Sequence, residues 1–294
     1  MSRDPDEVWF LWPDGPPGET PGHLVGEVVE RSSDPAWRDR AARTTTAPTL
    51  SLVRPERPNG ASVLLIPGGA YQWVVIDKEG FDIAEVFVAA GVTCFVLSYR
   101  LPCDGWAVGP LAPLQDAQRA MRMIRATSDR LDLDPGRVAV LGASAGGHLA
   151  GWMAVGSAAY DPSDATDDLQ YRPDLTLLLY PVASMGTATH EPTRDALLGP
   201  GAAAEERQAH SLEAMDWTGT VPVWMAHAID DPYVPVENAT DLLASLRRAG
   251  VPAEAHLFHA GGHGFAIRWC EGRSVRLWPE LAMEFGRDHG WLRE

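Results

Sequence analysis

A hydroxyl, an imidazole and a carboxylate stand in this sequence in settings suited to nucleophilic catalysis. Ser144 lies in the pattern Gly142-x-Ser144-x-Gly146, between an apolar run at 137–141 and a helical segment at 149–157. A strand that turns directly into a helix crowds the backbone around the serine, and glycines remove the β-carbons that would collide there. The serine hydroxyl is then lifted clear of the strand. The pattern predicts a nucleophile elbow, although such small residues also occur at helix starts for packing alone.

A serine hydroxyl is a weak nucleophile at neutral pH, so it needs a base within hydrogen-bond reach and a group that orients the base. Asp230 and Asp231 follow an apolar run at 221–226, and His263, flanked by glycines, follows another at 254–258. An acidic turn or a histidine in a loop means little by itself. Their joint occurrence after apolar strands, in the order serine, aspartate, histidine, predicts a catalytic triad.

The elements that must position these residues alternate between strand and helix. Short apolar or alternating runs predict strands at 24–31, 49–54, 62–66, 92–97, 137–141, 175–180, 221–226 and 254–258. Amphipathic segments predict further helices at 80–90, 114–131, 236–249 and 273–289. Such alternation is typical of an α/β fold, here a mostly parallel, twisted sheet of eight strands with helices on both faces.

The chain is expected to form one domain preceded by an arm. Residues 1–24 are rich in Pro, Gly and Trp, which predicts an extended segment that packs on its own domain or on a second subunit, making a homo-oligomer through the arm. Residues 25–294 contain no repeat and no linker. The polar excursions at 158–174 and 183–219 interrupt the core strands and are candidates for a cap over the site.

Composition narrows the classes of partner. The chain of 294 residues is 45% hydrophobic and 22% charged, as in ordinary soluble proteins, and no run is long enough for a membrane span. Its net charge of −16 argues against nucleic acid or an anionic membrane, and disfavours strongly anionic substrates unless a local arginine intervenes. The acidic N-terminus lacks the apolar stretch of a signal peptide, so we expect a cytoplasmic protein.

No cofactor or metal is expected. The cysteines are odd in number and lack the spacing of metal ligands, and the glycine-rich turns lack the spacing of phosphate or dinucleotide loops. The histidines nearest the motifs, His148, His227 and His259, are interpreted as structural. A small-molecule substrate is the partner that this sequence favours.

Several motifs together resemble those of microbial α/β-hydrolases of the carboxylesterase type, close to acetyl xylan esterase-like and hormone-sensitive-lipase-like enzymes. The resemblance covers about residues 45–290. Besides the elbow, it rests on Pro67-Gly68-Gly69-Ala70-Tyr71, Ser98-Tyr99-Arg100-Leu101, Asp230-Asp231 with Pro235, and Gly262-His263-Gly264-Phe265. These motifs are specific for the fold and far less specific for a substrate.

The resemblance implies roles for the triad. Ser144 becomes the nucleophile and His263 the base, and Asp230 is favoured as the acid because related hydrolases carry it as the first of the pair, five residues before Pro235. Asp231 would then face solvent or cap the following helix. Residue types alone leave the exchange of the two aspartates open.

An oxyanion hole needs backbone N–H groups aimed at the developing alkoxide. Ala145, directly after the nucleophile, is one expected donor. By resemblance to the His-Gly-Gly-Gly loop of esterases, Gly69 and Ala70 are the others. Here Pro67 replaces the histidine and Ala70 the last glycine, and the first change matches the acetyl xylan esterase-like branch better.

The expected activity is hydrolysis of short-chain acyl esters, with acetylated sugars among the candidates, through an acyl-enzyme. Four aromatic side chains are candidates for the acyl or sugar pocket: Tyr71, Trp73, Trp106 and Trp152. One alternative is a peptidase or amidase of the prolyl-oligopeptidase-like clan, although this chain is too short for the propeller domain of such peptidases. Another is a non-catalytic ligand-binding protein on the hydrolase fold.

Overall fold

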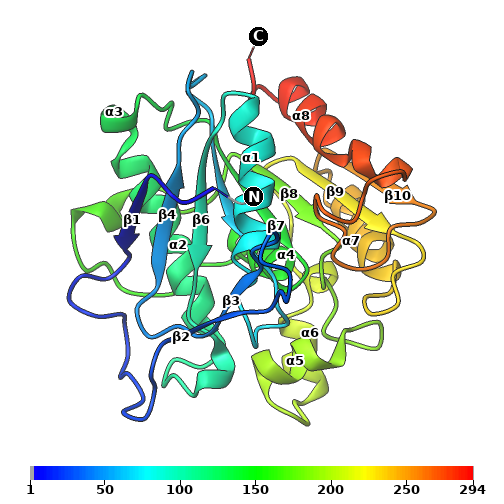
Figure 1. Cartoon of the computed structure of the whole chain (residues 1–294). Helices are drawn as coiled ribbons and strands as arrows, with labels where there is room; N and C mark the ends of the chain where they lie inside the picture. Colours follow the sequence, from blue (N-terminus) through cyan, green and yellow to red (C-terminus); the bar gives the residue numbers. More distant parts are fainter. Residues whose placement is uncertain (1–2, 294) are drawn as a thin grey trace.

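The computed structural model describes residues 3–293, and an eight-stranded sheet runs through it (Figure 1). Met1, Ser2 and Glu294, at the ends of the predicted arm and domain, lie outside the described residues. The strands, in spatial order, are β1 (Glu7–Phe10), β4 (Thr49–Val53), β6 (Thr93–Ser98), β5 (Ser62–Ile66), β7 (Val138–Ala143), β8 (Leu175–Leu179), β9 (Val223–Ala228) and β10 (Ala253–Phe258). β1 pairs antiparallel with β4 and β4 antiparallel with β6, and the remaining pairs are parallel.

Helices cover both faces of the sheet because the central strands are apolar on both sides. β5, β7 and β8 are buried along their whole length. The α-helices are α1 (Asp82–Ala89), α2 (Leu111–Ala126), α3 (Ser128–Leu131), α4 (Ala145–Val155), α5 (Glu191–Leu198), α6 (Ala204–Ala209), α7 (Glu237–Arg248) and α8 (Trp278–Asp288). α2, α4 and α7 contribute to one apolar cluster, and α1 and α8 contribute to the cluster on the other face. The predicted α/β class and strand number are confirmed.

One strand assignment is wrong. The predicted strand at 24–31 lies outside the main sheet: β2 (Glu27–Glu30) pairs only with β3 (Arg40–Thr44) in a separate hairpin. The eighth strand is instead β1, inside the predicted arm. Apart from Pro5, the prolines and glycines of the arm follow β1, so they do not prevent its pairing with β4.

The arm packs on its own domain. Trp9 contacts Phe95 with ring centroids 5.8 Å apart, and the buried Trp12 donates its indole N–H to Asp116 at 2.8 Å. Both tryptophans therefore join the first apolar cluster, Trp12 within it and Trp9 against it.

The two predicted cap segments lie in different places. The segment 158–174 packs along α2, where Arg119 forms ion pairs with Asp164 and Asp167 at 2.6 and 3.0 Å. The segment 183–219 carries α5 and α6, which lie at the same end of the sheet as the β2–β3 hairpin (Figure 1). Only the second segment approaches the predicted site, as described below.

The turn from β7 into α4 is the elbow that the glycines predict. Ser144 has φ 55° and ψ −120°, a conformation that side chains rarely adopt. A β-carbon on Gly142 would collide with the carbonyl oxygen of Gly146, and one on Gly146 with that of Ile66. The glycines thus allow α4 to start against the ends of β5 and β7.

We predict that Gly142→Ala destabilises the fold by about 3 kcal/mol or more, because the new methyl group meets backbone atoms that cannot move aside. Gly151→Ala in α4 is the matched control, since its methyl group would meet only the flexible end of Leu212. Urea unfolding monitored by circular dichroism measures both. Equal stability of the two variants would show that the elbow is not under this steric constraint.

Candidate active site

The side chains of Ser144, His263 and Asp231 form a continuous chain of hydrogen bonds. His263 Nε2 lies 3.0 Å from Ser144 Oγ, and His263 Nδ1 lies 2.7 Å from Asp231 Oδ2. A carboxylate can only accept, so Nδ1 carries the proton and Nε2 accepts the serine O–H. Ser144 follows β7, Asp231 follows β9 and His263 follows β10, so three strand ends supply the three groups.

The partner of His263 is Asp231, and the favoured assignment of Asp230 is wrong in the structure. Asp230 points into the neighbouring loop, where its Oδ1 accepts the N–H groups of Gly261 and Gly262, both at 2.8 Å. The turn after β9 closes with the N–H of Asp231 on the carbonyl of Ala228, which directs Asp231 back to the sheet edge. Two adjacent aspartates have the same local chemistry, so only this backbone path separates them.

The surroundings of Asp231 keep it ionised. Burial alone would raise the pKa of its carboxyl group, but hydrogen bonds from His227 and His263 outweigh burial and lower the pKa below its usual value. Its Oδ1 also accepts the N–H groups of Tyr233 and Val234, both at 2.9 Å. The buried His227 lies 3.4 Å from Oδ2 and donates to the carbonyl of Val234 at 2.9 Å. A fixed negative charge therefore faces the imidazole.

The three residues predicted to form the oxyanion hole lie near Ser144, two of them in the same pocket and the third next to it in the chain. Gly69 and Ala70 line the same pocket as Ser144, and both have positive φ, 130° and 57°. Ala145 is the first residue of α4, where N–H groups have no partner within the helix. Within residues 3–293, none of these three N–H groups has a hydrogen-bond acceptor. The prediction that they bind an oxyanion therefore meets no competing acceptor in the described residues.

The loop that carries Gly69 and Ala70 is fixed by its neighbours. Gly68 donates its N–H to Glu79 at 2.9 Å, and the N–H of Trp73 closes the loop on the carbonyl of Gly69 at 2.9 Å. These hydrogen bonds therefore fix the backbone of Gly69 and Ala70 in the absence of a substrate.

Tyr71 does not line the pocket; its buried side chain anchors this loop to α4. Its hydroxyl donates to His148 Nδ1 at 2.8 Å, while His148 Nε2 donates to the carbonyl of His210 at 2.7 Å. Burial lowers the pKa of His148 to about 4, so the ring is neutral at pH 7. His148 thus connects the oxyanion loop, α4 and the end of α6.

A pocket of about 340 Å³ opens over the serine and the imidazole. Besides Ser144, His263, Gly69 and Ala70, it is lined by Arg31, Gln72, Trp73, Val75, Lys78, Glu79, His190, Pro192 and Tyr233. Arg31 comes from the β2–β3 hairpin, directly after β2. His190 and Pro192 come from the segment 183–219, at the start of α5. The segment 158–174 contributes none of the described lining residues.

Of the four aromatic side chains predicted for the pocket, only Trp73 lines it. Trp106 is buried beneath the Arg100 guanidinium, 5.0 Å away, and Trp152 packs against His148 with ring centroids 5.8 Å apart. Like the ring of Tyr71, these two rings are buried in the core. Core packing and binding sites use the same residue types, so the sequence did not distinguish them.

Two further pocket residues, Lys78 and Glu79, were not predicted from the sequence. Residues Asp77–Phe81 form a buried turn of π-helix whose side chains reach both the pocket and the oxyanion loop. One signal was available, because Lys78 is the only lysine in the chain.

The described residues contain neither a helix suited to spanning a membrane nor a cluster of metal ligands. None of their helices combines the length and the apolar character required to cross a bilayer. Among them, no group of three or more His, Cys, Asp or Glu side chains is arranged as metal ligands.

The model of a family described as alpha/beta hydrolase fold matches residues 63–267, which include the serine, both aspartates and the histidine described above. The chain belongs to this α/β-hydrolase family. It is 33% identical over 223 residues to endo-1,4-beta-xylanase B of Butyrivibrio fibrisolvens, covering 76% of this chain and 35% of that protein. It is 28% identical to an acetylxylan esterase of Xylanibacter ruminicola, covering 81% of this chain and 46% of that protein. This α/β-hydrolase therefore spans less than half the length of these curated relatives.

Solved structures agree with the family assignment. The acetyl ester-xyloside bifunctional hydrolase of Caldicellulosiruptor lactoaceticus superposes with a TM-score of 0.77 at 28% identity, covering 99% of this chain and 98% of that one. A propionate-bound esterase of Thermogutta terrifontis superposes with a TM-score of 0.69, covering 92% of this α/β-hydrolase and 96% of that chain, and its 23% identity supports the fold alone.

The two aspartates give a matched pair of variants. We predict that Asp231→Asn lowers kcat for an activated ester by roughly 10³- to 10⁴-fold, because an amide facing Nδ1 cannot stabilise the imidazolium and favours the wrong tautomer. Asp230→Asn retains an oxygen that can accept both glycine N–H groups, so we expect activity within a few-fold of wild type. Steady-state kinetics of both variants test this. The reverse ranking would restore Asp230 as the acid.

Proposed function

We propose that this α/β-hydrolase is a serine carboxylesterase that cleaves short-chain acyl esters through an acyl-enzyme. The observation that carries the proposal is the hydrogen-bonded chain from Ser144 through His263 to the ionised Asp231, set beside unpaired backbone N–H groups. Each part of this arrangement serves one step of acyl transfer.

In the first half-reaction, Ser144 Oγ attacks the ester carbonyl carbon while His263 Nε2 takes the hydroxyl proton. The N–H groups of Gly69, Ala70 and Ala145 bind the negative oxygen of the tetrahedral intermediate. Asp231 holds the ring in the tautomer needed and stabilises the imidazolium. As the intermediate collapses, His263 returns the proton to the leaving alcohol.

In the second half-reaction, water occupies the place of the alcohol. His263 takes a proton from the water, whose oxygen attacks the acyl carbon. The tetrahedral intermediate again places its oxygen on the same N–H groups. Collapse releases the carboxylic acid and returns the proton to Ser144.

Short acyl groups on small alcohols or sugars are the proposed substrates. A pocket of about 340 Å³, bounded by the start of α5, suits a compact ester better than a long acyl chain. The partly buried indole of Trp73 offers a flat apolar surface of the kind on which sugar rings stack. Similarity to an acetylxylan esterase and to an acetyl ester-xyloside hydrolase supports acetylated sugars as substrates.

We predict that Ser144→Ala lowers kcat for p-nitrophenyl acetate by at least about 10³-fold, because no other group can form the acyl-enzyme. Ser157→Ala, which removes an exposed hydroxyl after α4, is the control and is expected to retain wild-type kinetics. Release of p-nitrophenolate, followed by absorbance, measures both. Near-wild-type turnover by Ser144→Ala would refute the esterase proposal.

A further inference from the structure

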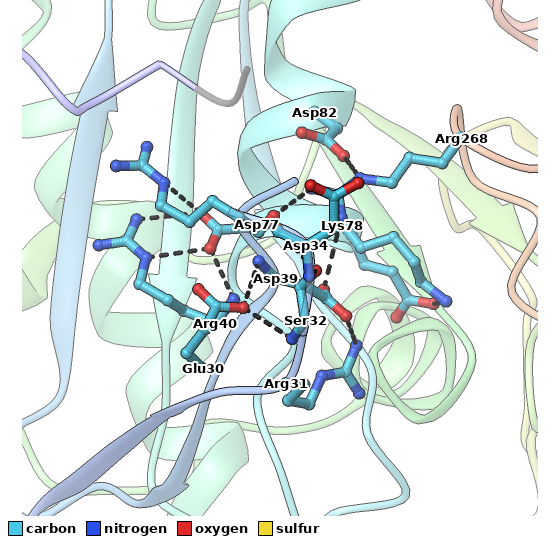
Figure 2. A network of polar contacts seen from close by, with 12 residues as sticks. Glu30, Arg31, Ser32, Asp34, Asp39, Arg40, Asp77, Lys78, Asp82 and Arg268 are labelled. Atoms are coloured by element: carbon cyan, nitrogen blue, oxygen red, sulfur yellow. Dashed lines mark hydrogen bonds and ion pairs between the residues drawn. The ribbon is translucent and has the colours of Figure 1, made fainter. Parts of the chain in front are cut away.

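Lys78 is placed unusually for a lysine. Its side chain is only 9% exposed, yet it lines the pocket together with Ser144 and His263. Figure 2 shows the polar network around it, in which the buried Asp77 accepts the backbone N–H of Arg40 at 2.7 Å and its guanidinium at 2.9 Å. These contacts pin the start of the π-helical turn to β3. The backbone that carries Lys78 is therefore held in place.

The ammonium group of Lys78 has unused donors. Its nearest carboxylate oxygen, Glu79 Oε1, is 3.8 Å away, beyond hydrogen-bond distance. Glu79 is itself engaged, because Oε2 accepts the N–H of Gly68 at 2.9 Å and Oε1 the hydroxyl of Tyr180 at 3.2 Å. In the part of the chain that the structure describes, Nζ makes no hydrogen bond. The side chain is nearly buried, and its ammonium group keeps N–H donors that a bound molecule could use.

The surroundings of Nζ hold it in position. The indole of Trp269 lies over it, 4.0 Å from Nζ to the ring centroid, and covers it on that side. A β-carbon on Gly264 would lie 2.8 Å from Nζ, so this glycine leaves the space that the ammonium occupies. Because Gly264 directly follows His263, Nζ lies beside the loop that carries the catalytic base.

We propose that Lys78 determines specificity for the alcohol part of the ester, by donating a hydrogen bond to a hydroxyl or ring oxygen of a polyol or sugar. The inference rests on the proposed esterase function, in which His263 protonates the leaving alcohol. A hydrogen-bond donor beside the His263 loop is therefore better placed to contact the alcohol part of the substrate than to contact its acyl group.

The charges around Lys78 favour a neutral oxygen over a carboxylate. Glu79 supplies the nearest negative charge, and Arg31, the other cation lining the pocket, is paired with Asp39 at 2.7 Å. A carboxylate on the substrate would add a second negative charge beside Glu79. A hydroxyl or ring oxygen accepts the hydrogen bond without adding charge.

The test compares two acetate esters, a methyl β-xyloside carrying one acetyl group and ethyl acetate, whose alcohol has no further oxygen. We predict that Lys78→Met lowers the ratio of kcat/KM for the xyloside to that for ethyl acetate by 10- to 100-fold, the range expected for a hydrogen bond to a charged donor. Lys78→Arg keeps N–H donors and is expected to recover a large part of the ratio. Proton release in a pH-stat measures all reactions.

A structural role for Lys78 would lower both rates together and leave the ratio unchanged, which would overturn the inference. A second measurement does not depend on turnover: in the Ser144→Ala background, calorimetric binding of methyl β-xyloside is expected to weaken at least 10-fold when Lys78→Met is added. Equal binding would also overturn the inference. Wild-type protein that hydrolyses neither ester would instead refute the esterase proposal, whatever the binding result.

Discussion

The backbone conformation of Ser144 is the constraint on which the rest of the site depends. A residue with φ 55° and ψ −120° costs about 1–3 kcal/mol, which the packing around it must supply. Gly142 and Gly146 make that packing possible, because β-carbons at either position would collide with carbonyl oxygens. The turn aims Oγ at His263 and places the N–H of Ala145 beside it.

The parallel sheet brings the other groups to the same place. Loops after β5, β9 and β10 supply the proposed oxyanion donors, acid and base. Glu79 links the loop after β5 to the surroundings of His263. It accepts the N–H of Gly68 and the hydroxyl of Tyr180, and the ring centroid of Tyr180 lies 5.0 Å from that of His263. The π-helical turn that carries Lys78 therefore supports the oxyanion loop as well as the pocket wall.

Local patterns in the sequence predicted the parts that local sterics determine. The elbow at Ser144, the base His263 and the alternation of strands and helices depend on residue types and spacing within short segments. The choice between Asp230 and Asp231 depends on how one turn closes on Ala228, which residue types do not encode. Likewise, whether an indole lines a pocket or fills the core depends on tertiary packing, so the sequence could not separate Trp73, which lies at the pocket, from the buried Trp106 and Trp152. β1 was missed because prolines that follow it dominate the composition of the arm.

The central claim is that Ser144 is a nucleophile activated by His263 and Asp231, and covalent trapping tests it most directly. After incubation with a fluorophosphonate probe, intact-mass measurement and peptide mapping should find one adduct, on Ser144, and His263→Ala should slow its formation by several hundred-fold or more. Absence of an adduct, labelling at another residue, or equally fast labelling of His263→Ala would contradict the account.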